Sequence, residues 1–471
     1  MTTTRPLPSA LRWRHAATLC AAMLVVGSGL VIAPAAFAAE TPTPTPAVSP
    51  VTPAPEPTAD AGVGTMVAAA RAGGVFEPGT DLVVDVRLTN GGASTTVAGT
   101  ATMRVGATAL ADETSIADWL AGGTVTGLFT DIGTVAVAPV SAGATTNFEM
   151  TGSRIVTTLT DLTPGVYPIE VSYVAGTVTH TDHTVIMVPQ AGDNVSVVVP
   201  FTAPAITSGL LTPAALAELT DADGDLTLAL RAAQQANVIV AVDPAIIAAM
   251  RVLGRSAPAS VQAWLTAFDE LDNDIFALPF ADPDIATLVA AGQPTLGPTS
   301  LTRYLDASFT QPIDAATPTP GATPGAVPTL DELLAIPGAF DDLVWPTGGT
   351  MTQATAEWAA AEDKTVLVSS AQADASQAHV TLDGSGADAL VYDAELSAAL
   401  SIAVTENDAV LRNDSLSTVL ALASMTNDSR VLVALERGLE WDEAATTDTL
   451  TALEEASSGR LAGEVSLRAQ T

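Results

Sequence analysis

The sequence predicts a multidomain protein in which an all-β, immunoglobulin-like sandwich precedes an α/β domain, a complete or degenerate (β/α) barrel. Three observations predict this order. Apolar and polar residues alternate between residues 64 and 190. Strand and helix patterns then alternate over residues 193–471, and two apolar strands of that region stop at an Asp-Pro pair. Buried parallel strands deliver acidic side chains in this way to the carboxyl edge of an α/β sheet.

Residues 1–38 have the pattern of a signal peptide. Three arginines precede an apolar stretch at residues 19–32, and Ala36-Phe37-Ala38 matches a small-x-small cleavage site. We therefore expect an exported protein, extracellular or associated with a cell wall. An uncleaved N-terminal anchor is the alternative.

Two tracts rich in Pro and Thr predict extended segments. Residues 39–63 form a linker that includes TPTPTPAVSPVTPAPEPT, where proline excludes both helix and strand pairing. Residues 316–328 contain a second such tract inside the α/β region. Because strand and helix alternation resumes after it, we interpret this tract as a flexible loop rather than a domain boundary.

Charge and cysteine content exclude several classes of function. The chain of 471 residues has 17 basic and 52 acidic residues and a formal charge of −35, which disfavours nucleic acid as a partner. No glycine-rich loop for a nucleotide phosphate is present. The only cysteine lies in the signal peptide, so the mature chain is expected to form no disulfide.

The first domain is predicted from alternation with a period of two. Leu82, Val84, Val86 and Leu88 share one face of a strand that ends at an Asn-Gly-Gly turn. Further strands are predicted at residues 100–105, 133–140, 146–151, 154–159, 165–174 and 178–188. Several short antiparallel strands in one region indicate an immunoglobulin-like sandwich.

The second domain is predicted from about seven strand-helix units. Apolar strands are expected at residues 195–199, 238–242, 275–280, 342–345, 365–369, 389–392 and 431–435, with helical patterns between them. This number of units matches the size of a (β/α) barrel. A doubly wound open sheet is the alternative.

Asp243, Asp282 and Asp284 are candidate catalytic or binding residues because they follow two of these strands directly. Carboxylates on neighbouring strand ends can be about 5 to 10 Å apart, the separation that glycoside hydrolysis requires. Asp243 and Asp282 are the predicted catalytic pair, and Asp284 is a predicted binding residue. The alternative is structural, because an Asp before Pro caps the start of a helix.

Trp345, Asp393 and Glu436 also follow strands and are predicted binding residues. A tryptophan at a strand end can stack on a sugar ring, although packing at the rim of the barrel explains it equally. No metal ion or other cofactor is predicted. A barrel deacetylase needs an Asp with a His-x-x-x-His pair, and the sequence contains no such pair.

A resemblance to a known family rests on several short motifs in a fixed order. They include Val-Asp243-Pro-Ala-Ile, Ala-Leu-Pro279-Phe-Ala-Asp282, Val-Trp345-Pro-Thr-Gly and Val-Leu-Val-Ala-Leu435-Glu-Arg-Gly. The chain resembles an uncharacterised actinobacterial family of envelope proteins, domain-of-unknown-function family 6049. The resemblance implies a glycosidase- or deacetylase-like barrel, a link to cell-wall biogenesis and a membrane tether in a longer form. It implies no activity.

Two functions follow from these observations. The first is a non-enzymatic binding or adaptor module of the cell envelope, with a cell-wall glycan or an envelope protein as its partner. The second is a carbohydrate-active hydrolase without metal that uses Asp243 and Asp282. The first is favoured because no complete catalytic constellation can be named.

Overall fold

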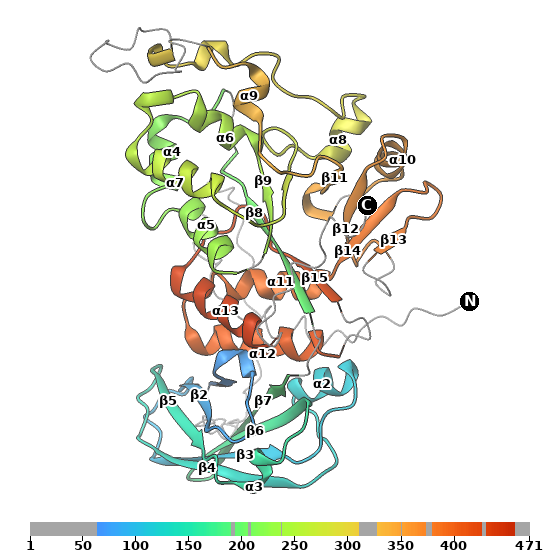
Figure 1. Cartoon of the computed structure of the whole chain (residues 1–471). Helices are drawn as coiled ribbons and strands as arrows, with labels where there is room; N and C mark the ends of the chain where they lie inside the picture. Colours follow the sequence, from blue (N-terminus) through green and yellow to red (C-terminus); the bar gives the residue numbers. More distant parts are fainter. Residues whose placement is uncertain are drawn as a thin grey trace, which may run out of the picture.

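The computed structural model describes residues 64–456 except 190–193, 206–208, 237, 310–326, 350, 374–378 and 426–429. The predicted signal peptide and linker, residues 1–63, lie outside the described residues, as does the 316–328 loop up to residue 326. Within the described part, no helix is long and apolar enough to cross a membrane. Figure 1 shows a β-rich part in blue and teal beside a larger part, in green to red, that contains strands and helices.

The β-rich part consists of two antiparallel sheets. One has the order β1-β2-β5, from Thr65–Ala70, Leu82–Thr89 and Thr145–Gly152. The other has the order β4-β3-β6-β7, from Phe129–Val137, Gly99–Gly106, Gly165–Ala175 and Val178–Val188. The predicted face of β2 is buried, and Val84, Val86 and Leu88 are fully inaccessible. They pack in one apolar cluster with Ile169 and Tyr173 of the other sheet.

Two local predictions in this part need correction. Residues 154–159 do not form a strand, because the chain makes the short helix α3 (Thr157–Thr160) and buries Leu159 against the core. Helix α2 (Glu113–Leu120) was not predicted. It begins at a capping box in which Asp112 accepts from the backbone N–H of Ser115 and the Ser115 side chain bonds back. Serine in place of the usual Glu or Gln weakens this signal in the sequence.

The second part contains two four-stranded sheets. One is parallel with the order β10-β9-β8-β15, from Ile275–Ala277, Ile239–Val242, Asn194–Phe201 and Arg430–Ala434. The other has the order β11-β12-β14-β13, from Leu343–Val344, Thr365–Ser369, Asp388–Tyr392 and His379–Thr381. Only β13, which was not predicted, runs antiparallel within it.

Helices lie between most of these strands along the chain, although no helix is described between β12, β13 and β14. They are α4 (Pro213–Leu219), α5 (Asp225–Gln235), α6 (Pro244–Arg251), α7 (Ala259–Asp269), α8 (Ile285–Ala290), α9 (Leu330–Leu334), α10 (Gln353–Ala361), α11 (Ala394–Ala403), α12 (Ala409–Ala423) and α13 (Glu443–Ala456). Several begin where the sequence indicates. Asp243 caps α6 with Pro244 at its first position, and Asp393 caps α11.

Backbone hydrogen bonds join the two sheets at both edges. Beside β10, the N–H of Phe340 donates to the carbonyl of Ile275 at 2.8 Å. At the other edge, the N–H of Asp393, after β14, donates to the carbonyl of Leu432 in β15 at 2.8 Å. All seven parallel strands contribute to one apolar cluster, which includes Val198, Ile239, Phe276, Leu343, Leu367, Leu390 and Leu432.

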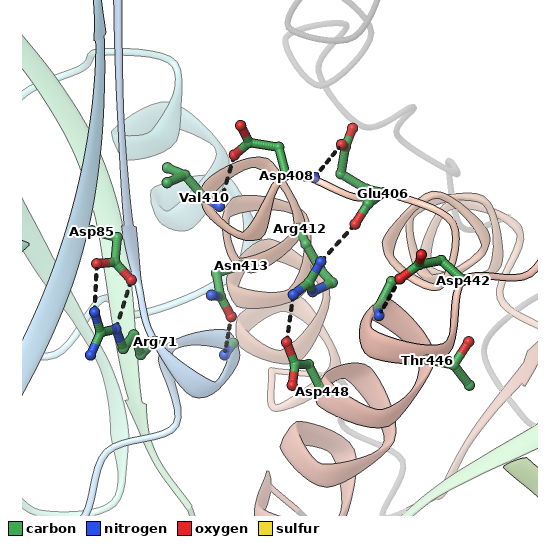
Figure 2. Close-up of polar contacts among 12 residues, drawn as sticks. Arg71, Asp85, Glu406, Asp408, Val410, Arg412, Asn413, Asp442, Thr446 and Asp448 are labelled. Atoms are coloured by element: carbon green, nitrogen blue, oxygen red, sulfur yellow. Dashed lines mark hydrogen bonds and ion pairs between the residues drawn. The ribbon is translucent and has the colours of Figure 1, made fainter. Parts of the chain in front are cut away.

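Helix α12 packs against the β-rich part (Figure 2). Leu416 and Leu420 of α12 share an apolar cluster with Val185 and Met187 of β7. Polar contacts surround this cluster. The Asn413 side chain accepts from the buried N–H of Gly73 at 3.1 Å, and Arg87 pairs with Asp408. The two parts are therefore joined by a continuous core rather than by sequence connection alone.

We expect Gly73→Ala to destabilise the protein by about 2 to 4 kcal/mol, from backbone strain and overpacking. Gly73 has φ +58°, and an added Cβ would lie 3.0 Å from Leu416 Cβ and from Leu420 Cδ1. Gly79→Ala is the matched control, because Gly79 has φ +90° and no atom within 4 Å of the added Cβ. Urea unfolding of both variants measures the difference. Equal losses of stability would contradict the tight packing of α12.

Candidate functional site

Asp243 lies at the carboxyl end of β9 and is 6% exposed. Its Oδ1 accepts two backbone hydrogen bonds at 2.8 Å, from Ala245 in the first turn of α6 and from Ala281 in the loop after β10. The same carboxylate thus caps its own helix and fixes the neighbouring loop. This geometry matches the structural alternative for Asp243.

Asp282 does not cap a helix. It ends a tight turn in which its N–H donates to the carbonyl of Pro279 at 2.8 Å. Ala281 and Asp282 have φ values of +64° and +45°, the left-handed region that costs non-glycine residues about 1 to 2 kcal/mol each. The turn brings Asp282 Oδ1 to 2.7 Å from Nη1 of Arg437. The ion pair and the bond from Ala281 to Asp243 hold this strained turn in place.

Arg437, which was not predicted as a site residue, connects three strand ends. It follows β15, and its Nη1 donates to Asp282 and, at 2.6 Å, to the Thr347 hydroxyl. Its Nη2 donates to the carbonyl of Trp345, just after β11, at 2.7 Å. The guanidinium carbon lies 4.4 Å from the centre of the Trp345 ring, a cation–π contact. One signal was available, because Arg437 is a rare cation beside a strand end in an acidic chain.

Burial shifts the ionisation of this group of residues. It raises the pKa of Asp243 to about 6, although the two backbone N–H groups that donate to it oppose the shift. Burial also raises the pKa of Asp282 to about 6, and the positive charge of Arg437 partly counteracts this. For Arg437 itself, burial lowers the pKa below its usual value. The charged forms of all three side chains are therefore disfavoured by their surroundings.

The other predicted residues are Asp284, Asp393, Trp345 and Glu436, and none of them pairs with Asp243 or Asp282. Asp284 caps α8 by accepting from the N–H groups of Ala286 and Thr287, and Asp393 caps α11 by accepting from Leu396. Trp345 is 6% exposed, with Arg437 over its ring and Phe276 and Tyr392 beside it. Its ring is therefore almost fully covered, which leaves little surface for stacking on a sugar. Glu436 is exposed.

A cavity of about 440 Å³ lies at the carboxyl ends of β11, β12, β14 and β15, beside the first turns of α11. Its polar lining consists of Thr347, Ser369, Tyr392, Ser397, Glu436 and Arg437. The cavity thus unites the predicted residues Trp345 and Glu436 with the unpredicted Arg437. Asp243, Asp282, Asp284 and Asp393 do not line it. Among the described residues, no group of three or more His, Cys, Asp or Glu side chains is placed to hold a metal ion.

The arrangement provides recognition groups more readily than a catalytic pair. Glycoside hydrolysis needs two carboxyl groups on either side of the bond to be cleaved. Here Asp243 is held by two backbone donors, and Asp282 by Arg437. The carboxylate that reaches the cavity belongs to Glu436. Hydroxyl, phenol, carboxylate and guanidinium groups around a cavity of this size suit the binding of a small polar ligand.

The fold and the site define a multidomain protein of several sheets and helices with a polar cavity at the ends of parallel strands. The model of a family of unknown function (DUF6049) matches residues 11–462. The chain belongs to this family.

No curated protein matches the chain. Similar solved structures include the sporulation control protein Spo0M from Bacillus subtilis, with 11% identity, a TM-score of 0.20 and coverage of 28% of this chain and 51% of Spo0M. A cycloisomaltooligosaccharide glucanotransferase from Paenibacillus sp. has 15% identity, a TM-score of 0.23 and coverage of 78% and 52%. A β-glucosidase from Listeria innocua has 9% identity, a TM-score of 0.17 and coverage of 26% and 16%. The chain spans about half or less of each of these proteins, and the TM-scores are too low to support an argument.

We expect Asp243→Asn to flatten the dependence of stability on pH. A carboxyl with a pKa of about 6 in the folded protein and 3.8 as its ordinary value stabilises the fold fully below 3.8 and loses that contribution as pH rises through 6. Asparagine keeps an acceptor oxygen for Ala245 and Ala281 but has no charge. Between about pH 4 and pH 7, the wild type should therefore lose roughly 3 kcal/mol more than the variant.

Urea unfolding at several pH values measures this slope. Asp118→Asn, which removes an exposed carboxylate from α2, controls for the change in net charge. If the stability of the variant depends on pH as steeply as that of the wild type, Asp243 is not the source of the pH dependence.

Proposed function

We propose that this chain is an exported, non-enzymatic binding module of the cell envelope that binds a cell-wall glycan in the cavity at the strand ends. Its two parts are an immunoglobulin-like sandwich and a (β/α) barrel of seven parallel strands. Export rests on the signal-peptide pattern of residues 1–38. The link to cell-wall biogenesis rests on the family resemblance that the sequence motifs carry.

Two observations support the immunoglobulin-like assignment. Sheets of three and four antiparallel strands enclose one apolar cluster. In addition, Tyr167, near the start of β6, donates from its hydroxyl to the carbonyl of Thr163 at 2.9 Å. Such a bond to the backbone a few residues upstream is a tyrosine corner, which is frequent in these sandwiches.

The barrel assignment is supported by the order of the strands. β8, β9 and β10 are successive neighbours in one sheet, β11, β12 and β14 are successive neighbours in the other, and a backbone hydrogen bond from Asp393 to Leu432 links the end of β14 to β15. β15 pairs with β8, and the contact between Phe276 and Phe340 joins the two sheets next to β10. The apolar cluster shared by all seven strands would be the barrel interior. Ligand sites of such barrels lie at the carboxyl ends of the strands, where this cavity is.

The non-enzymatic assignment rests on one observation: both candidate carboxylates already have hydrogen-bond or ion-pair partners within the protein. Asp243 accepts from Ala245 and Ala281, and Asp282 is paired with Arg437. Neither lines the cavity. The cavity itself offers hydroxyl groups and an exposed carboxylate, which are the groups that hydrogen-bond to the hydroxyls of a sugar.

The second candidate function, a carbohydrate-active hydrolase that uses Asp243 and Asp282, is favoured by one observation. Both carboxyl groups have a pKa raised to about 6. A raised pKa is what a general acid needs at neutral pH. The experiment below separates binding from turnover.

We expect the wild type to bind purified cell-wall glycans without releasing sugars, and Ala398→Trp to reduce binding at least tenfold by filling the cavity. Ala398 is exposed on α11 and lines the cavity. Ile402→Trp is the matched control, because it adds the same side chain one turn further along α11, outside the lining. Sedimentation with the glycans measures binding, and a reducing-sugar assay measures turnover.

Three outcomes would contradict the proposal. Release of sugars by the wild type that disappears in Asp282→Asn would support the hydrolase. Equal binding by the two tryptophan variants would place the glycan elsewhere, and an absence of glycan binding would turn attention to a protein partner.

A further inference from the structure

Arg437 is the cation of the cavity. It is the basic side chain among the described residues that line the cavity, and it is 11% exposed. A guanidinium has five N–H donors, and three hydrogen bonds are formed here, to Asp282, Thr347 and the Trp345 carbonyl. Its Nε is buried and has no hydrogen-bond partner among the described residues. A buried donor of a charged group without an acceptor is costly, so the protein compensates this guanidinium only in part.

The pairing of Arg437 with Asp282 is incomplete when compared with another arginine of the same chain. Arg71 holds Asp85 through Nε and Nη2, at 2.7 and 2.9 Å, in the two-bond geometry that a guanidinium and a carboxylate favour (Figure 2). Asp282 instead contacts Arg437 through Nη1 alone. Asp282 is therefore held by one bond to the guanidinium, a weaker pairing that a ligand carboxylate can displace.

We infer that the ligand of this cavity is an acidic sugar whose carboxylate is bound by Arg437 in competition with Asp282. This inference rests on the proposed glycan-binding function and adds to it the charge of the ligand. The cavity of about 440 Å³ is large enough for one sugar ring, and Tyr392, Ser369 and Glu436 would contact its hydroxyls. A carboxylate fits better than a phosphate because Asp282, Asp243 and Glu436 repel its single negative charge less than the nearly double charge of a phosphate.

Ionisable groups on four strand ends determine how such a ligand binds. Asp282 and Asp243, after β10 and β9, and Glu436, after β15, repel a carboxylate when they are charged. Tyr392 of β14 also faces the guanidinium. Because burial raises the pKa of Asp282 to about 6, protonation near that pH releases Arg437 from its partner. An acidic sugar should therefore bind with uptake of a proton, and its affinity should rise as pH falls.

The test compares acidic sugars with neutral sugars that have the same ring. Calorimetric titration of the wild type uses glucuronate against glucose, and N-acetylmuramate against N-acetylglucosamine, between about pH 5 and pH 7.5. One linked proton predicts that the acidic sugars bind roughly tenfold or more tightly at the lower pH. The neutral sugars should change much less.

Asp282→Asn isolates the competitor. In this variant the affinity for acidic sugars should depend less on pH than in the wild type, because the partner of Arg437 is neutral and Asp243 and Glu436 alone remain to repel the ligand. Arg437→Met should remove the preference for acidic sugars, with circular dichroism confirming that the variant is folded. If Arg437→Met does not fold, the wild-type and Asp282→Asn titrations still decide the matter.

Three outcomes would overturn the inference. Equal affinity for acidic and neutral sugars at all pH values would refute it and leave the glycan-binding function intact. Equal binding of glucose 6-phosphate and glucuronate would refute the specificity for a carboxylate. Failure of every sugar and of the polymeric glycan to bind would refute both the inference and the proposed function.

Discussion

The bonding of Arg437 is the constraint on which the site depends. Arg437 itself follows β15. Its guanidinium bonds to Asp282 after β10 and to Trp345 and Thr347 after β11. Removing one partner of a buried ion pair costs about 3 to 5 kcal/mol, because the other charge is left buried alone. The left-handed turn at Ala281 and Asp282 is thus stabilised by a contact from the far end of the chain. Arg437, Trp345 and Thr347, which these bonds join, all line the cavity.

The sequence predicted those parts of the fold in which burial determines the spacing of apolar residues along the chain. In β2, alternation follows directly from one face packing on the core, and in β9 every residue is apolar because both faces are covered. Prediction was wrong where local and tertiary signals differ. Residues 154–159 alternate weakly, but the closure of the sandwich at Leu159 favours the short helix α3. Strand β13 is three residues long and has no strong pattern of its own.

The position of the candidate residues at the strand ends was predictable, but the direction in which their side chains point was not. An Asp after a buried strand marks the carboxyl edge of the sheet, and Asp243, Asp284 and Asp393 all lie there as helix caps. Which way a carboxylate points depends on donors elsewhere in the chain. Asp282 and Arg437 are 155 residues apart, so no local pattern connects them. The second donor to Asp243, from Ala281, likewise arises only when β9 and β10 become neighbours.

The same burial that raises the two carboxyl pKa values also argues for recognition over catalysis. A general acid must direct its proton at the bond that breaks, and therefore needs an orientation free of competing donors. Oδ1 of Asp243 accepts hydrogen bonds from two backbone N–H groups, and Oδ1 of Asp282 accepts one from the guanidinium of Arg437. The polar groups that line the cavity are Glu436, several hydroxyl groups and Arg437. Under the proposed function, such a set selects a ligand by charge and hydrogen bonding.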